Sequence, residues 1–174
     1  ERAGKAYDPR IARRFLAEAS GLLAGIEAEG IWETVLAAEP PPWHWLDEFQ
    51  LDAVARAMAH FADVKSVYTL GHSTGVAELA EAAARDLDLS EAHVTTVRRA
   101  GLLHDLGRIG VPFGIWDKRG PLSESEWERV RMHPYLTERV LARSAALSPL
   151  GALAALHHER LDGSGYHRGV TAPS

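Results

Sequence analysis

Residues 103–112 read LHDLGRIGVP, and they follow an apolar repeat with helical spacing that includes Val94, Val97 and Leu102. The pair His104-Asp105 is therefore expected to close a helix, and Gly107 to end it. An imidazole beside a carboxylate at a helix end is typical of a metal site. A pair that only satisfies the helix terminus by hydrogen bonding is an equally common explanation of this dipeptide taken alone.

Helices are also predicted upstream of this stretch. Apolar residues between Asp47 and Phe61 recur at helical spacing, so a helix is expected there. An alanine-rich helix is expected over residues 72–87. Ser90 is a typical N-cap residue, and it begins the helix that ends at His104-Asp105.

Three further helices are predicted downstream. Ser123 and Glu126 form the sequence signature of a capping box, which begins a helix leading to Pro134. Another helix is expected over residues 135–143. Ser148-Pro149 begins a last helix, and its C-terminal end is predicted to carry His157 and His158.

Residues 109–122 differ from these segments because they are interrupted by glycine and proline, and they are predicted to form a loop. Elsewhere in the chain no segment alternates apolar and polar residues with a period of two, so no strand is required. The predicted fold class is all-α.

The N-terminal part is expected to form a helical preface. Asp8-Pro9 begins a helix that should end near residues 25–30, and a short helix over residues 31–38 stops at the triplet Pro40-Pro41-Pro42. Because this triplet is the best linker in the chain, we expect a preface over residues 1–46 and a main domain over residues 47–174.

The composition excludes several functional classes. The chain has 174 residues, 46% of them hydrophobic and 25% charged, which is typical of an ordinary globular domain. A net charge of -5 provides no basic surface for nucleic acid. The absence of cysteine excludes disulfides and thiolate metal sites. No apolar run reaches the roughly 18 to 20 residues of a membrane span, so we expect no membrane contact and a cytoplasmic location.

Histidines gather at the predicted helix ends in the second half of the chain. His72 begins a helix, His133 closes one, and His157-His158 close another, in addition to His104-Asp105. Nitrogen and oxygen ligands without sulfur suit Fe, Mn, Zn or Ni, and Asp105, with two oxygens, is the natural bridge between two metals. For His44, His60 and His93 we expect ordinary surface or capping positions.

Four motifs in the same order resemble the signature of HD-GYP domains, over about residues 60 to 170. They are GHS at residues 71–73, LHDLGRIGVP at 103–112, MHP at 132–134 and HHERLDGSGY at 157–166. The resemblance implies an all-helical HD-domain bundle with a centre of two or three metal ions. It also implies hydrolysis of phosphodiesters, with cyclic di-GMP as the leading substrate.

The resemblance also implies roles for individual residues. Asp105 and Arg108 would be catalytic, and Arg108 would contact phosphate together with Lys118. Two divalent metal ions are implied, Fe or Mn before Zn, Ni or Mg. The metal ligands would be His72, His104, Asp105 as the bridge, His133, His157 and His158, and the substrate loop would contain Gly163, Gly165 and Tyr166.

The chain departs from the family pattern at several positions. Arg108 stands where the family usually has lysine, and His167 stands where it has proline after the glycine-tyrosine pair. Tyr68 occupies the place of a glutamate that three-metal members use, so two metals are expected. The aspartate that follows the substrate loop in HD domains would lie beyond Ser174.

We therefore expect an excerpt of a longer bacterial protein, truncated at the C-terminal end of its HD-GYP-like domain. The preface resembles the tail of a preceding HD-like unit, and a LuxR-type regulator is the expected context. One hypothesis is a phosphodiesterase acting on a cyclic dinucleotide or another phosphodiester. The alternative is a catalytically impaired HD domain that senses a nucleotide or a partner within a transcription regulator. The sequence leaves a homodimer open.

Overall fold

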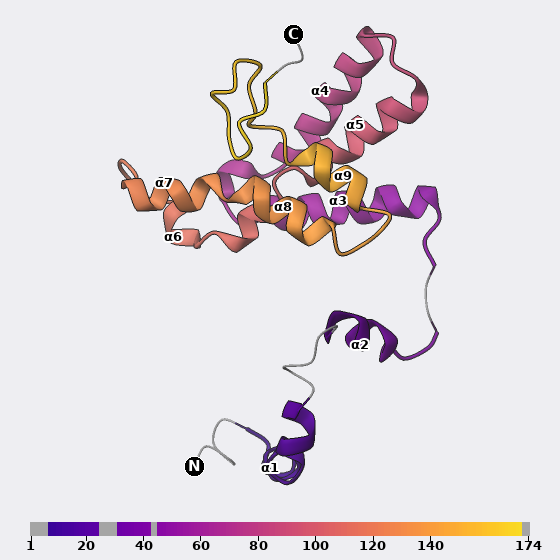
Figure 1. The fold of residues 1–174 in the computed structure, drawn as a ribbon, viewed down its shortest axis with the longest axis vertical. Helices are drawn as coiled ribbons and strands as arrows, with labels where there is room; N and C mark the ends of the chain where they lie inside the picture. Colours follow the sequence, from indigo (N-terminus) through magenta and orange to yellow (C-terminus); the bar gives the residue numbers. More distant parts are fainter. Residues whose placement is uncertain (1–6, 25–30, 43–44, 172–174) are drawn as a thin grey trace. The chain divides into compact units, whose positions relative to one another are not determined.

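A computed structural model describes residues 7–24, 31–42 and 45–171, and these residues form helices joined by turns (Figure 1). The chain divides into two compact units, residues 1–45 and residues 46–174. Within the described residues no strand is present, and an isolated β-bridge joins Asp162 to Thr171. The predicted all-α fold is confirmed.

The first unit contains α1 (Pro9–Ala24) and α2 (Ile31–Ala37). The Asp8 carboxylate accepts hydrogen bonds from the backbone N–H groups of Arg10 and Ile11, at 2.7 and 3.3 Å, so α1 begins as predicted. The predicted end of this helix near residues 25–30 lies outside the described residues, as does His44.

The second unit contains the remaining elements. In chain order they are α3 (Glu48–Asp63), η1 (Val67–Thr69), α4 (His72–Asp86), α5 (Glu91–Leu103), η2 (Leu106–Gly110), α6 (Phe113–Trp116), α7 (Glu124–Arg131), α8 (His133–Leu141) and α9 (Ser148–Ala154). The longest are α3, α4 and α5, and shorter helices follow them. No helix within the described residues has both the length and the apolar character needed to cross a membrane.

Helix α5 lies at the centre of this unit and packs against α3, α4 and α9. Its Leu102 and Leu103 are buried in a core that also contains Ala77 of α4 and Leu150 of α9. At Gly101 a Cβ atom would lie 2.9 Å from the Cα of Ala77, so the lack of a side chain lets α4 and α5 approach closely.

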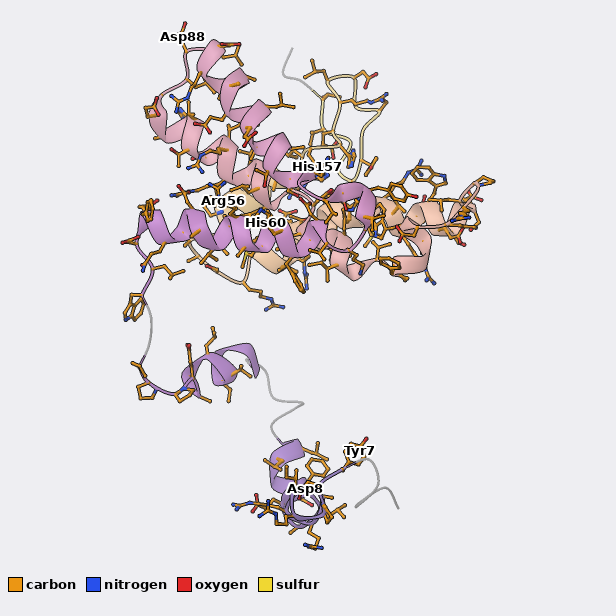
Figure 2. The ribbon with its side chains drawn as sticks, turned by 180° about the vertical axis from the view of Figure 1, so that it is seen from behind. Tyr7, Asp8, Arg56, His60, Asp88 and His157 are labelled. Carbon is orange, nitrogen blue, oxygen red and sulfur yellow. The ribbon has the colours of Figure 1, made fainter. Side chains whose placement is uncertain are left out.

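The helix starts at Ser90 and Ser123 are confirmed. The Ser90 hydroxyl accepts a hydrogen bond from the N–H of His93. Ser123 and Glu126 exchange both hydrogen bonds of a capping box. Figure 2 shows the turn between α4 and α5, where Asp88 adopts a φ of 53°.

The prediction of a loop over residues 109–122 was wrong in part. The 3-10 segment η2 extends to Gly110, and α6 occupies Phe113–Trp116. Pro112 stands at the N-cap of α6, where its missing N–H costs nothing, and Ile115 is buried with Val111 and Val130 in a second apolar cluster. Gly107 lies inside η2, since α5 already ends at Leu103.

Two other helix boundaries differ from the prediction. Pro134 lies in the first turn of α8, so His133 begins that helix and does not close the preceding one. A proline is tolerated there because the first backbone N–H groups of a helix have no partner within it. Helix α9 ends at Ala154, and His157 and His158 lie in the turn that follows.

Candidate metal centre

The predicted ligands come together from four separate segments of the second unit. They form two groups, and within each group the candidate ligand atoms lie within 4.8 Å of one another. The first group contains His72 at the start of α4 with His104 and Asp105 at the end of α5, and the second contains His133 at the start of α8 with His157 and His158 after α9.

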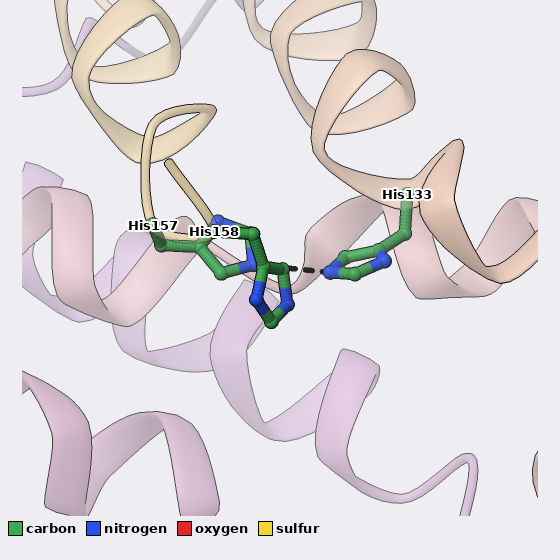
Figure 3. A group of neighbouring side chains, drawn as sticks. All are labelled: His133, His157 and His158. Carbon is green, nitrogen blue, oxygen red and sulfur yellow. Dashed lines mark hydrogen bonds between the residues drawn. The ribbon is translucent and has the colours of Figure 1, made fainter. Parts of the chain in front are cut away.

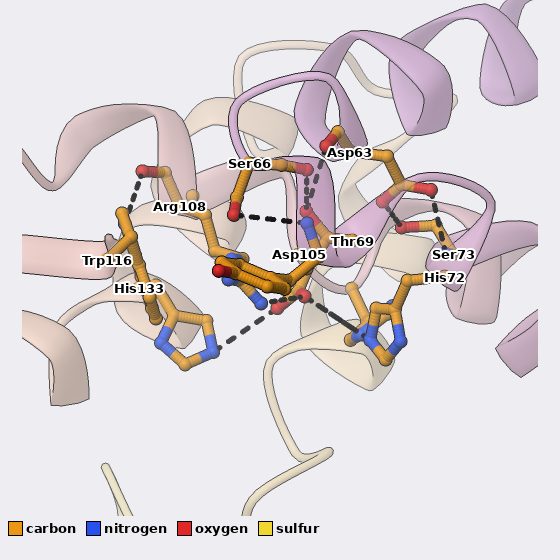
Figure 4. Close-up of polar contacts among 12 residues, drawn as sticks. Asp63, Ser66, Thr69, His72, Ser73, Asp105, Arg108, Trp116 and His133 are labelled. Atoms are coloured by element: carbon orange, nitrogen blue, oxygen red, sulfur yellow. Dashed lines mark hydrogen bonds and ion pairs between the residues drawn. The ribbon is translucent and has the colours of Figure 1, made fainter. Parts of the chain in front are cut away.

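Asp105 lies between the two groups (Figure 4). Its Oδ2 is 3.5 Å from the Nε2 of His72 and 3.4 Å from the Nε2 of His104. Its Oδ1 is 3.4 Å from the Nε2 of His133 and 3.7 Å from the Nε2 of His157. One carboxylate oxygen therefore faces each group, which is the arrangement that a bridging ligand requires.

Three of the imidazoles are anchored in the same way. The Nδ1 of His104 lies 2.7 Å from the carbonyl oxygen of Gly101, that of His133 lies 2.6 Å from Val130, and that of His157 lies 2.7 Å from Ala154. A carbonyl oxygen can only accept, so each Nδ1 carries the proton. The Nε2 lone pair of each ring is left to face the centre, as in metal-binding histidines.

The second group has a property that favours a cation. The Nε2 atoms of His133 and His157 lie 3.0 Å apart (Figure 3). Burial lowers the pKa of His133 to about 4 and the pKa of His157 to about 3, so both rings are neutral at pH 7. Two lone pairs then face each other without a proton between them, and a metal ion would relieve that repulsion.

The separations between these atoms also fit a metal ion. Ligands about 2.1 Å from one cation are separated from each other by roughly 3.0 to 3.4 Å. The contacts of Asp105 with His104 and with His133, both at 3.4 Å, match this spacing. The donor set of imidazole nitrogens and a carboxylate suits a divalent transition metal.

Charge is concentrated on Asp105 and His104. Burial opposes ionisation of Asp105, but His104 and Arg108 outweigh burial and hold the pKa of its carboxyl below the usual range. Burial likewise disfavours the imidazolium form of His104, yet the neighbouring Asp105 raises the pKa of His104. The centre therefore contains one ionised carboxylate beside an imidazole whose pKa it raises.

Arg108 contacts the centre from the side of η2. Its Nη1 donates to Oδ2 of Asp105 at 3.0 Å, and its guanidinium carbon lies 3.9 Å from the centroid of the Trp116 ring. The Arg108 side chain is 18% exposed, so it is held against these two partners.

The centre opens into a cavity of about 680 Å³, within the size range of small-molecule sites. Lys118 also lines this cavity, with its Nζ 2.6 Å from Oε2 of Glu126, and this hydrogen bond lowers the pKa of Glu126 to about 2. The lining also contains apolar and aromatic side chains, which include Val76, Ile115, Trp116, Leu122, Trp127 and Val130.

A family model described as HD domain matches residues 55–173. The chain belongs to the HD domain family. The family that the motifs predicted is thereby confirmed, whereas the LuxR-type context stays a prediction.

Relatives of this HD domain include named phosphodiesterases. The chain is 40% identical over 172 residues to 3'3'-cGAMP-specific phosphodiesterase 3 of Vibrio cholerae, covering 97% of this chain and 37% of that protein. It is 37% identical over 124 residues to a cyclic di-GMP phosphodiesterase of Thermotoga maritima, covering 70% of this chain and 33% of that protein.

The solved structures include a similar fold. The chain matches the crystal structure of a cyclic GMP-AMP-specific phosphodiesterase of Vibrio cholerae, V-cGAP3, with a TM-score of 0.57 and 37% sequence identity. The match covers 90% of this chain and 39% of that one. The chain thus spans about a third of the length of the curated relatives it matches.

The predicted substrate loop of the HD domain reaches the cavity through Tyr166. The Tyr166 ring stacks on His158, with centroids 4.5 Å apart, and lines the cavity. Gly163, with a φ of 75°, and Gly165 shape the turn and are not among the described residues that line the cavity. At Gly165 a Cβ atom would lie 2.5 Å from the carbonyl oxygen of His158.

Several positioning residues of the HD domain were missed from the sequence. The Thr137 hydroxyl accepts from the N–H of Gly107 at 2.8 Å and donates to the carbonyl of His104 at 2.9 Å, which joins α8 to the His104-Asp105 turn. Its place four residues after His133, on the same face of α8, was the available signal. Asp63, which holds Ser73, gave no local signal.

Two further described histidines, His60 and His93, lie outside the centre. His60 is exposed on α3, where its Nε2 lies 3.4 Å from the Thr74 hydroxyl (Figure 2). His93 is exposed in the first turn of α5, with its Nδ1 3.0 Å from the Ser90 hydroxyl. Both match the surface positions predicted for them.

Proposed function

We propose that this chain is the HD-domain part of a metal-dependent phosphodiesterase that hydrolyses a cyclic dinucleotide, with cyclic di-GMP as the leading substrate. The observation that carries the proposal is the position of Asp105, whose two oxygens face two separate groups of imidazole nitrogens. Two adjacent cations are the usual requirement for displacement at a phosphodiester.

In this proposal two divalent ions, Fe or Mn, occupy the centre. One would be held by His72 and His104, the other by His133, His157 and His158, and Asp105 would bind both. Bound cations of this kind lower the pKa of a water molecule and neutralise charge on phosphate oxygens. Tyr68 supplies no carboxylate for a third ion, which favours two.

The chain's own residues would orient the substrate. Arg108 and Lys118 place positive charge beside the centre and are proposed to contact phosphate oxygens. The aromatic side chains that line the cavity, among them Trp127 and Tyr166, are suited to planar bases. The relatives named for cyclic di-GMP and for 3'3'-cGAMP support a cyclic dinucleotide, and the substrate of the whole protein is part of the proposal.

The test is hydrolysis by the purified protein. Protein loaded with Mn or Fe(II) is incubated with cyclic di-GMP and, separately, with 3'3'-cGAMP, and the products are separated by chromatography. Asp105→Asn and His104→Ala should abolish turnover and lower the metal content. His60→Ala is the matched control, because His60 is an exposed histidine outside the centre.

Metal content separates the enzyme from the sensory alternative. Protein purified without added metal should contain two equivalents of Fe or Mn by elemental analysis. No hydrolysis of either dinucleotide with any metal would contradict the proposal. Nucleotide binding by that inactive protein, measured by calorimetry, would instead support a sensory domain.

A further inference from the structure

Trp116 contacts Arg108 in two ways (Figure 4). Its indole ring lies under the guanidinium group, 3.9 Å from the guanidinium carbon, and its Nε1 donates to the backbone carbonyl of Arg108 at 3.3 Å. The same ring also contacts His133, with the ring centroids 5.8 Å apart and the ring planes inclined by 74°. Trp116 therefore joins Arg108 to one side of the metal centre.

Arg108 needs this second attachment because Asp105 has competing partners. The Oδ2 atom that accepts from Arg108 also lies 3.4 Å from His104 and 3.5 Å from His72. A cation held by those groups would share the negative charge of Asp105 and repel the guanidinium. The attraction between the guanidinium and the negative face of the indole does not depend on Asp105.

The flat shape of the arginine side chain matters for this contact. A guanidinium group stacks on an aromatic face and keeps N–H groups free at its edge, whereas a lysine ammonium is a compact point charge. Asp105 accepts a hydrogen bond from Nη1 of the guanidinium group. The other N–H groups of Arg108 are therefore not used by Asp105 and can serve a ligand in the cavity that Arg108 lines.

We propose that Trp116 is a positioning residue that holds the Arg108 guanidinium in the cavity so that it can bind a phosphate group. The inference rests on the proposed function only in taking a phosphate-bearing ligand as the occupant. It also explains how arginine works at the position where the family usually has lysine, because Trp116 provides the face on which only a guanidinium lies flat.

The contact itself is tested by NMR on the metal-free protein. Ring current from the indole should shift the side-chain resonances of Arg108 upfield. Trp116→Leu should remove the shift, and Trp116→Phe should keep most of it while losing only the Nε1 hydrogen bond. Trp127→Leu is the matched control, since Trp127 lines the same cavity from α7, and it should leave the Arg108 resonances unchanged.

The consequence is tested by a double-mutant cycle on Mn-loaded protein, with inorganic phosphate as the probe. Arg108→Lys and Trp116→Leu should each weaken phosphate binding by about 3- to 30-fold, the range expected for a partly desolvated cation–π contact. The double variant should be no weaker than either single one, because both changes remove the same interaction. In the control pair, the fold-changes in phosphate affinity caused by Trp127→Leu and by Arg108→Lys should multiply in the double variant.

Each outcome decides the proposal. Unshifted Arg108 resonances in wild-type protein would overturn it. It would also be overturned if Trp116→Leu and Arg108→Lys weakened phosphate binding independently, so that their fold-changes multiplied in the double variant. Loss of Mn from Trp116→Leu would mean that the ring supports His133 instead, which also overturns it. Coupled effects at full Mn content would support it even if no dinucleotide is hydrolysed, so the two proposals can fail separately.

Discussion

At the scale of single residues, the centre depends on how each imidazole is held. His104, His133 and His157 each donate from Nδ1 to the carbonyl oxygen three residues earlier. This hydrogen bond selects one tautomer and restricts the ring, so the Nε2 atoms face the centre before any ligand binds. Because these rings are already ordered in the free protein, metal binding costs little further side-chain entropy, which favours high metal affinity.

The affinity for metal should depend on pH first through His104. Burial disfavours its charged form, but Asp105 outweighs burial and raises the pKa, so His104 keeps a competing proton to a higher pH than an ordinary imidazole. His133 and His157, with pKa values of about 4 and about 3, stay neutral. In calorimetric titrations, the affinity for Mn should therefore begin to fall while the pH is still above 6.5, and fall further as the pH is lowered. An affinity for Mn that did not change down to pH 6 would contradict the prediction that His104 titrates first.

Gly107→Ala should prevent normal packing of α8. An added Cβ atom would lie 2.0 Å from the carbonyl oxygen of His133 and 2.5 Å from the backbone N of Thr137, so backbone would have to move. We expect a loss of at least about 3 kcal/mol in the free energy of unfolding, measured with urea. Gly75→Ala is the control, since nothing lies within 4 Å of a Cβ there. An equal loss in both variants would disprove the close-approach argument.

At the scale of elements, the ligands come from helix ends. Helix α4 begins at Gly71 without a side-chain cap of its own. Asp63, at the end of α3, replaces that cap by accepting from the N–H of Ser73 at 3.0 Å and from its hydroxyl at 2.7 Å. Thr69 donates to the carbonyl of Asp63 at 2.8 Å. The start of α4, and with it His72, is thus fixed by a neighbouring helix.

Asp63→Ala should affect both stability and metal binding. The buried N–H of Ser73 would lose its acceptor, at a cost of about 1 to 3 kcal/mol in the free energy of unfolding. Mn affinity should fall as well, because His72 is the neighbouring residue. Asp47→Ala is the control: it removes the N-cap of α3 and should cost about 1 kcal/mol without changing Mn affinity. Equal Mn affinity in both variants would rule out a positioning effect of Asp63.

At the scale of the whole molecule, local signals were sufficient for most helices. Ser90 and Ser123 are capping residues directly before periodic apolar stretches, and both begin helices. The prediction of a loop around Pro112 was wrong at α6. Glycine and proline interrupt the helical spacing of apolar residues there, but they do not show that one short helix, α6, fits between them. Pro134 was misplaced for a related reason, since proline ends one helix or begins the next with the same local signal.

The candidate site was predictable only in its chemical groups. The order of the motifs identified the side chains that gather around Asp105, because each motif carries its own histidine. The contacts of Trp116 with Arg108, of Thr137 with Gly107 and of Asp63 with Ser73 depend on how separate segments pack. Spacing could at most place Thr137 on the face of α8 that carries His133, and the contacts themselves required the structure.

Metal removal should lower the stability of the second unit as a whole. The proposed ligands come from the start of α4, the end of α5, the start of α8 and the turn after α9, so a bound ion would join segments that unfolding separates. Binding to the folded state alone stabilises it by about 2.7 kcal/mol when free metal is one hundred times its Kd.

A chelator should therefore lower the Tm by roughly 5 to 10 °C, in calorimetric scans of metal-loaded protein. Asp105→Asn provides the control, because it removes the carboxylate that faces both groups, and its Tm should respond little to the chelator. If the chelator removes the metal from wild-type protein and the Tm does not change, the metal does not join these segments. The metal would then bind to a helical bundle that is already complete without it.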